Sequence, residues 1–419
     1  MMKGERTYQP RCVMRFSREL YQIEDDITQR LPALRPAHAL GLALWVYGTV
    51  MAKSACMTAI MLELAQWMRP ATARQRLREW LKDGRDKARP CDAQVEITAC
   101  FPLLLRWVLD WWVGSTTLPL AIDAVSHQDR VVALVISVLY RGCAIPVAWH
   151  IVPAQEKGAW MPHILALVDH LAPAIPADWR TLVLVDRGLW SPKLWQHLRQ
   201  RKLHPLLRLA DGIAVRPAGR KRTVTPAHLV PKPGRAWVGH ADVFGEDARQ
   251  TGTLIVIWGI GHKERWVLLT DLAPRAVQHS WYGLRMWIEL GFRALKSLGW
   301  QWQRTRRSEP DRVARHWLVL AVATLWVLGC GTRDEDAAQL QTTPDRVRVP
   351  PQLPTPTGSS LSSLFARGLS AARRQLGHGR IWQRLWLRPS DLPGPYPDIE
   401  TVIHRNPKPD ILPERYIPL

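Results

Sequence analysis

The sequence has no cysteine arrangement typical of a metal centre or a disulfide framework. Its six cysteines are scattered, with neither a Cys-x2-Cys pair nor a companion histidine cluster (Cys12, Cys56, Cys91, Cys100, Cys143 and Cys330). Such usage is typical of a reduced intracellular protein in which cysteine serves as a small core residue. We therefore expect a cytoplasmic protein, without structural zinc or disulfides.

An uninterrupted apolar stretch long enough to cross a membrane is also missing. Residues 1–15 carry charges and no apolar segment, which argues against a secretory signal. The most apolar runs, 39–52 and 317–330, are each about 14 residues long, whereas a bilayer requires roughly 20. They predict buried helices. A basic protein of the membrane surface is disfavoured as well, because no long amphipathic or lipidation signal is found.

Acidic residues are too few to balance the basic ones. The chain has 36 Asp and Glu against 57 Lys and Arg, a formal net charge of +21. This excess favours a polyanionic partner, with nucleic acid ahead of an anionic membrane surface. A ribosome-associated protein or a merely basic enzyme is the alternative. With 47% apolar residues over 419 positions, we expect a folded protein of two or three domains.

Residues 1–112 predict an all-helical N-terminal domain that binds DNA. Thr72 is placed to cap a short basic helix. That helix and the apolar stretch before it resemble a helix-turn-helix, which would bring Arg74, Arg76 and Arg78 to DNA. An ordinary solvated helix face is the alternative. The predicted helical segments are 17–31, 40–68, 73–82 and 101–113.

From residue 113 the pattern changes to β-branched runs separated by short polar turns. The order β-β-β-α-β-α-β over 113–210 predicts an α/β fold, a mixed sheet flanked by helices. A β-rich insertion follows at 211–271, and helices at 280–298 and 311–330 complete the second part of this core, 272–333. The remainder, 334–419, is Pro-rich with one basic helix near 361–376, and its tail from Pro389 onward is expected to be loosely ordered.

Two aspartates end apolar strands. Asp123 closes Leu-Ala-Ile-Asp, and Asp186 closes Val-Leu-Val-Asp. A carboxylate in such a place is costly unless a metal ion or an arginine compensates its charge. A single strand-end aspartate is as easily structural as catalytic, but two in one predicted sheet of a basic protein favour a metal site.

A third acid, Glu289, lies on a predicted helix between cations. Tyr282, Arg285, Glu289 and Lys296 are spaced i, i+3, i+7 and i+14, which places them within a stripe of about 60° on a regular α-helix. A salt-bridged solvent face is the alternative, because Arg285 and Glu289 are also an i,i+4 pair. Tryptophans and aliphatic residues on the other sides argue against free solvent exposure.

The pattern Tyr-x2-Arg-x3-Glu-x6-Lys resembles the signature of one branch of the bacterial DDE insertion-sequence transposases. Val185-Asp186-Arg187-Gly188 followed by Ser191 is similar to that family's second acidic motif, and Asp123 matches the first. The β-rich stretch between Asp186 and Glu289 resembles the insertion that hairpin-forming members carry inside an RNase H-like core. The resemblance covers about residues 115–330.

The resemblance implies a DNA transposase that cleaves element ends and joins them to target DNA, by cut-and-paste. Asp123, Asp186 and Glu289 would hold two Mg²⁺ or Mn²⁺ ions, whose hard character suits oxygen ligands. Two element ends must be brought together, so a homodimer on double-stranded DNA is implied, associated with a prokaryotic nucleoid.

DNA contacts follow from the same resemblance. Tyr282, Arg285 and Lys296 would grip phosphates near the cut, and Trp266 would stack on a flipped-out base, although a strand tryptophan is more often core. A basic surface beyond the catalytic helix comprises Arg304, Arg306, Arg307, Arg312 and Arg315, with Trp300 and Trp302 interleaved for stacking or for core packing.

Two other functions compete with this one. An RNase H-like nuclease that hydrolyses without joining would not need the grip of Tyr282, Arg285 and Lys296. A DNA-binding protein derived from a dead transposase predicts the loss of one of the three acids, and none is lost.

Overall fold

The computed structural model describes residues 16–87, 94–156, 160–245, 248–342, 363–379 and 384–404. The prolines between residues 344 and 356 lie outside the described residues, as do Cys12 and Cys91. The α-helices are α1 (Arg18–Arg30), α2 (Pro36–Ala52), α3 (Met57–Leu64), α4 (Pro70–Leu81), α5 (Phe101–Trp111), α6 (Trp160–Leu171), α7 (Pro192–Gln200), α8 (Pro226–Leu229), α9 (Met286–Arg293), α10 (Pro310–Thr342) and α11 (Leu364–Gly377). The strands are β1 (Thr117–His127), β2 (Val131–Tyr140), β3 (Cys143–Pro153), β4 (Arg180–Val185), β5 (His204–Leu209), β6 (Arg216–Pro217), β7 (Arg235–Val243), β8 (Gln250–Trp258), β9 (Trp266–Thr270) and β10 (Glu400–Ile403).

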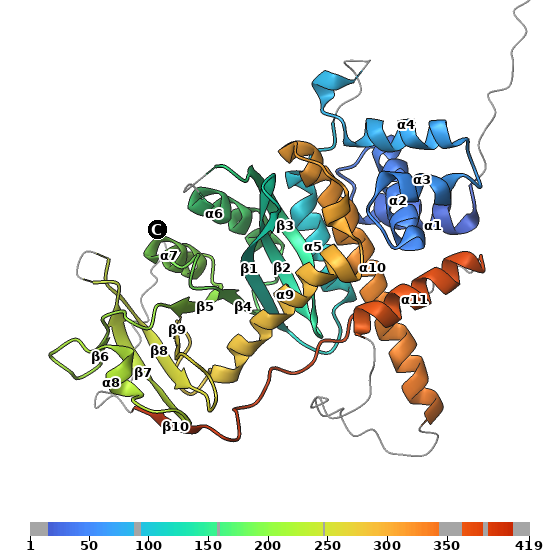
Figure 1. Cartoon of the computed structure of the whole chain (residues 1–419). Helices are drawn as coiled ribbons and strands as arrows, with labels where there is room; N and C mark the ends of the chain where they lie inside the picture. Colours follow the sequence, from blue (N-terminus) through green and yellow to red (C-terminus); the bar gives the residue numbers. More distant parts are fainter. Residues whose placement is uncertain are drawn as a thin grey trace, which may run out of the picture.

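One mixed sheet runs through the molecule (Figure 1). Its order is β10-β7-β8-β9-β5-β4-β1-β2-β3, and β6 pairs with β7. Strands β1, β2 and β3 form an antiparallel meander, while β4 and β5 run parallel to β1. An order of 3-2-1-4-5 with these directions is the RNase H-like arrangement, so the predicted fold class is confirmed.

The predicted insertion does not form a sheet of its own. Strand β9 pairs antiparallel with β5, so that β7, β8 and β9 continue the core sheet without a break. Backbone hydrogen bonds therefore connect the insertion directly to the strand beside Asp186. The insertion and the acids share one continuous framework.

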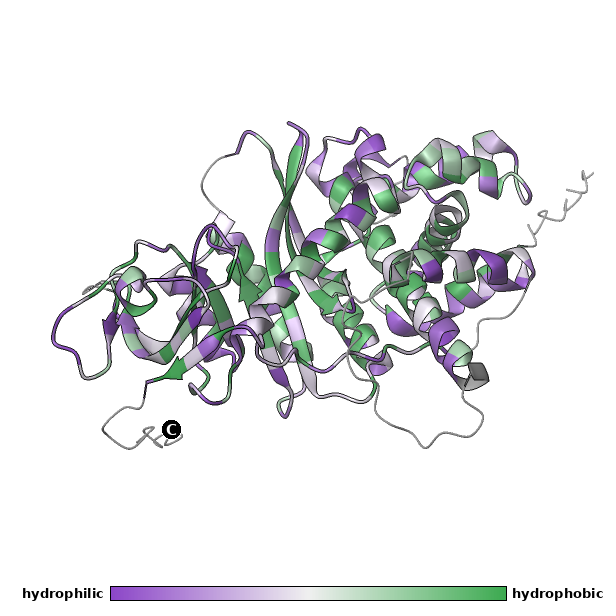
Figure 2. Ribbon diagram, turned by 60° about the horizontal axis from the view of Figure 1, so that its bottom comes forward, coloured by the Kyte–Doolittle hydropathy of each residue, from purple (hydrophilic) through white to green (hydrophobic). Residues whose placement is uncertain are grey.

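Helices cover both faces of the core strands. On one face, Leu120 and Ile122 of β1 meet Val168 of α6 and Leu198 of α7. Because successive side chains of a strand point to opposite faces, Asp123 lies on the other face, against which α9 packs. Figure 2 shows hydrophobic residues along the central strands and along the helices beside them. This double cover explains the nearly continuous apolar sequence of β2 and β3.

The N-terminal helices differ in detail from the prediction. The apolar stretch 40–68 is divided into α2 and α3, which meet at 98°. Helix α4 begins at Pro70 instead of after Thr72, because proline suits the first turn of a helix. Arg74 and Arg78 are exposed on α4 and Arg76 is half-buried. Their contact with DNA stays a prediction.

Helix α10 is the central helix of the protein and is longer than predicted. By length and hydropathy residues 310–339 would suffice to cross a membrane, but 94% of its apolar window is buried inside the protein. A glycine of α11 permits close packing on α10: a Cβ at Gly368 would lie 2.0 Å from the carbonyl oxygen of Val327. Burial within the protein accounts for the apolar composition of this helix.

Backbone hydrogen bonds hold the C-terminal segment 384–404 in place, contrary to the expectation of loose order for residues 389–404. The rest of that expectation falls on residues 405–419, which lie outside the described residues. Leu387 exchanges backbone hydrogen bonds with the end of α5, and Ser280 donates to the carbonyl of Pro393 at 3.0 Å. The segment then adds β10 to the edge of β7, in parallel (Figure 1). Composition failed here because backbone hydrogen bonds, to which proline contributes its carbonyl, hold the segment in place.

A buried ion pair between Asp83 and Arg315 links the helical N-terminal part to α10. The side chain of Arg315 is 3% exposed. We expect Asp83→Ala to lower the free energy of unfolding by about 3–5 kcal/mol, because it leaves an unpaired buried guanidinium. Urea denaturation measures this. The matched control is Asp86→Ala, which breaks the more exposed pair with Arg312 and should cost much less stability, because solvent screens an exposed ion pair. Equal losses in the two variants would contradict the assignment.

Candidate active site

Asp123 and Asp186 are brought together by the pairing of two parallel strands. Ile122 of β1 is in register with Val185 of β4, so the residues that follow them lie side by side. Asp123 was predicted to end its strand, but it lies inside β1, which continues to His127 along β2. The loss of the β4 partner after residue 122 gives the Asp123 carboxylate room beside Asp186.

Glu289 comes from α9, but the predicted regular helix 280–298 is in fact three pieces. A 3-10 helix spans His279–Arg285, α9 spans Met286–Arg293, and a π-helix spans Ala294–Leu298. Helix α9 packs so closely on β3 that a Cβ at Gly291 would lie only 2.7 Å from the Cβ of Ala144. The predicted stripe of about 60°, which assumes a regular α-helix, is therefore only approximate, and contact with the sheet positions Glu289.

All three acids converge on the guanidinium of Arg285. Its Nη2 lies 2.8 Å from Oδ2 of Asp123 and 3.4 Å from Oδ2 of Asp186, and its Nη1 lies 3.4 Å from Oε1 of Glu289. The Arg285 side chain is 14% exposed. The structure thus unites the three acids and one member of the predicted grip in a single cluster.

The charges of this cluster are perturbed by burial. Burial raises the pKa of Asp123 to about 6, against the opposing effect of Arg285 and of a hydrogen bond from the Ala124 amide. For Arg285, burial lowers the pKa, but the neighbouring carboxylates, Asp123 foremost, more than offset it, and the net pKa is raised. The site is therefore a partly buried cluster of carboxylates whose negative charge a cation stabilises.

Tyr282 and Lys296 lie at the edge of the cluster. The buried Tyr282 hydroxyl lies 3.4 Å from both the carbonyl oxygen of Val185 and Oδ1 of Asp186, as their donor. It therefore faces an acid, and the predicted donation to a DNA phosphate stays a prediction. Lys296 lies near Glu289, and burial lowers its pKa.

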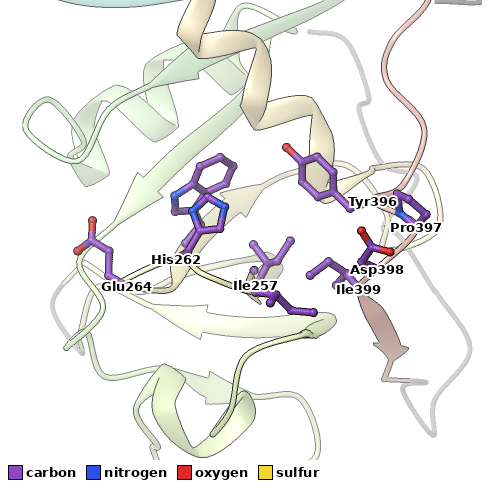
Figure 3. A pocket seen from close by; sticks show the side chains of 10 residues that line it. Ile257, His262, Glu264, Tyr396, Pro397, Asp398 and Ile399 are labelled. Atoms are coloured by element: carbon purple, nitrogen blue, oxygen red, sulfur yellow. The ribbon is translucent and has the colours of Figure 1, made fainter. Parts of the chain in front are cut away.

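Trp266 lies beside the acids and lines a pocket. Its ring meets that of Tyr282 edge-on, with centroids 5.3 Å apart. The pocket holds about 450 Å³ and is walled on the opposite side by the C-terminal segment (Figure 3). Its lining consists of Ile257, Gly259, Ile260, His262, Glu264, Trp266, Tyr396, Pro397, Asp398 and Ile399. Trp266 is thus half-buried and lines a cavity large enough to admit a nucleobase, instead of being fully core.

Sequence reasoning missed Arg208 and Glu264. Arg208 of β5 lies 3.8 Å from Asp186 and pairs with Glu264, which also holds Arg187 at 3.3 Å. A charged residue in the apolar strand Leu206-Leu207-Arg208-Leu209 was the available signal. These pairs tie the loop before Trp266 to the loop that carries Asp186.

The basic surface expected beyond the catalytic helix is only partly present. Arg304 and Arg306 are exposed, and their contact with DNA stays a prediction. Arg307 instead faces the ring of Trp45, and burial lowers its pKa to about 10. Arg315 is buried with Asp83, and Arg312 pairs with Asp86 and Glu309. Trp300 and Trp302 are both fully buried, so core packing holds for both.

The acids suit a hard divalent cation in their chemistry. They offer only carboxylate oxygens, and Asp123 is a buried carboxylate that already recruits a positive charge. Within the described residues no three His, Cys, Asp or Glu side chains lie close enough to hold one metal ion. The guanidinium of Arg285 stands among the three carboxylates in this arrangement. The donor chemistry of the acids fits Mg²⁺ or Mn²⁺, whereas their present spacing around Arg285 does not close on one ion.

Comparison with known proteins adds a domain assignment. Residues 136–326 match the family model of the transposase DDE domain. The matched region is a little under half of the chain, includes Asp186 and Glu289, and starts just after Asp123. No curated protein matches the chain significantly.

Among solved structures, the chain is similar to the cryo-EM structure of a piggyBac transposase synaptic complex with hairpin DNA. The sequences are 10% identical, and the match covers 91% of this chain and 85% of the other at a TM-score of 0.36. So loose a likeness places no residue.

We expect Asp123→Asn to stabilise the protein in EDTA at pH 8. The folded-state pKa, about 6, lies above the ordinary 3.8, so the ionised carboxylate costs stability above pH 6. Asparagine removes this cost, a gain of about 1–3 kcal/mol in the free energy of unfolding. As pH falls from 6 towards 3.8, the wild-type carboxyl takes up a proton and the gain shrinks.

Thermal and urea denaturation across pH measure the gain. Asp186→Asn is the control, because its carboxylate is a third exposed and should respond less. A loss of stability in Asp123→Asn at pH 8 would contradict the stated charge balance.

Proposed function

We propose that this protein is a DNA transposase that cleaves phosphodiester bonds at the ends of an insertion element and joins the freed ends to target DNA. The observation that supports this most directly is the convergence of Asp123, Asp186 and Glu289 on one point of an RNase H-like sheet. The match to the transposase DDE domain and the net charge of +21 support the same proposal.

The three acids would hold two Mg²⁺ or Mn²⁺ ions, which prefer carboxylate oxygens as ligands. Ions bound there would activate a water or a 3′-hydroxyl as nucleophile and stabilise the leaving oxygen. The protein's part is to fix the acids: β1 and β4 hold the two aspartates, and α9 holds Glu289. Tyr282 and Arg208 orient Asp186 from either side.

Phosphates of the DNA end would be held by Arg285 and Lys296, whose cationic groups lie beside the acids. Tyr282 would add a hydrogen bond to a phosphate if its hydroxyl turns from Asp186. Arg304 and Arg306, exposed beyond the catalytic helix, extend the contact to the flanking duplex.

A base next to the cut would enter the pocket beside Trp266. The pocket's volume, its aromatic wall and the contact of Trp266 with Tyr282 support this role, because a flipped base gains stacking energy on such a face. A flipped base would leave the duplex end free to form a hairpin. The two ends of an element would be brought together by a dimer of this chain, in the cytoplasm of a prokaryote.

We expect Asp123→Ala to abolish strand cleavage. Removal of this metal ligand should lower the cleavage rate about a thousandfold or more, while DNA binding is kept. Gel analysis of a duplex carrying the element's own ends, incubated with Mg²⁺, measures cleavage, and a mobility shift measures binding. Undiminished cleavage would falsify the metal-site assignment. Products that are cut but never joined would instead indicate a nuclease.

Trp266→Ala should spare the first nick and slow hairpin formation by about tenfold, because stacking on a single base contributes about 1–3 kcal/mol. Trp266→Phe should retain part of the rate. The control is Trp258→Ala, on the neighbouring strand β8 and outside the pocket lining. If Trp266→Ala and Trp258→Ala form hairpins equally fast, Trp266 does not stack on a base.

A further inference from the structure

Arg285 occupies the position at which the three acids would share their cations. Its guanidinium is within 3.4 Å of all three carboxylates, while its Nε is buried and has no hydrogen-bond partner. The unpartnered Nε shows that the observed position leaves one donor of Arg285 unused.

The charges favour a second cation over the guanidinium. Arg285 contacts all three carboxylates with a single positive charge, while Arg208 lies 3.8 Å from Asp186 and Lys296 lies near Glu289. A divalent ion among the three carboxylates would place two charges, at shorter range, where the guanidinium places one. A metal ion and the guanidinium compete for the same oxygens. Binding of the metal therefore requires Arg285 to leave, at the loss of three ion pairs.

We propose that Arg285 is a positioning residue that couples metal binding to DNA binding. In the free protein it holds the acids and opposes metal binding. A phosphate of the DNA end gives the guanidinium another anionic partner and so releases the acids. This inference rests on the proposed function of the site, and it adds that the protein takes up its metal ions tightly only when DNA is bound.

Coupling of this kind must be reciprocal, because the two binding equilibria share one side chain. DNA raises the affinity for metal, and metal raises the affinity for DNA by the same factor, about tenfold. Metal loading would then be confined to protein that already carries an element end. Arg285→Ala removes the competitor and with it most of the coupling.

The test is a titration of metal-free, DNA-free protein with Mn²⁺, followed by calorimetry and by the electron paramagnetic resonance signal of free Mn²⁺. We expect Arg285→Ala to bind Mn²⁺ about tenfold more tightly than the wild type. Arg285→Lys should lie between the two, because one amine cannot bridge three acids. The control is Arg293→Ala, an exposed cation one turn from Glu289 on α9, which should change the affinity less than about threefold.

A second measurement uses the duplex carrying the element end. Fluorescence anisotropy with and without Mn²⁺ gives the coupling factor, which should be about tenfold in the wild type and less than about threefold in Arg285→Ala. Circular dichroism and melting verify that each variant is folded, and Arg285→Lys serves if Arg285→Ala is not.

The outcomes separate the two proposals. Wild-type Mn²⁺ affinity in both Arg285 variants, together with loss of binding in Asp123→Ala, would overturn the role of Arg285 and leave the metal site intact. Unchanged Mn²⁺ binding in Asp123→Ala would overturn the metal site and the proposed function with it. Tighter binding in Arg293→Ala, equal to that in Arg285→Ala, would show a general charge effect and would also overturn the role of Arg285.

Discussion

The parallel pairing of β1 with β4 is the constraint on which the candidate active site depends. It sets Asp123 beside Asp186, on the sheet face to which α9 brings Glu289. A slip of one residue in that register would turn one aspartate to the opposite face, among the apolar side chains of α6 and α7. The extensive burial of Leu120, Ile122 and Val183 opposes such a slip, so packing on one face protects chemistry on the other.

Much of this arrangement follows from the sequence. The runs that became β1 to β5 are short, apolar and separated by polar turns, so their order was legible from local pattern alone. Asp123 and Asp186 stood out because a carboxylate in an apolar strand needs compensation, and Glu289 because of its spacing from Tyr282 and Arg285. The acids were predictable because a carboxylate within an apolar strand is energetically costly and is therefore kept mainly where the site needs it.

Other features depend on contacts distant in the sequence. No local pattern distinguishes Arg315, buried against Asp83, from the exposed Arg304 and Arg306. The segment that carries Glu289 is divided into 3-10, α and π turns where it packs on β3, and the C-terminal segment is held by backbone hydrogen bonds. Periodicity and composition register neither, because both are produced by partners far along the chain.

The place of β10 has a consequence for the order in which the protein is built. Strand β7 is complete at residue 243, but the strand that covers its edge comes at 400–403 and so leaves the ribosome much later. Until β10 is synthesised, residues 235–238 of β7 present unpaired backbone groups with which a strand of another chain could pair. A nascent chain, or one shortened by a late stop codon, therefore exposes the edge of the nine-residue β7 to edge-to-edge aggregation, whereas the finished protein ends the sheet there with the four-residue β10.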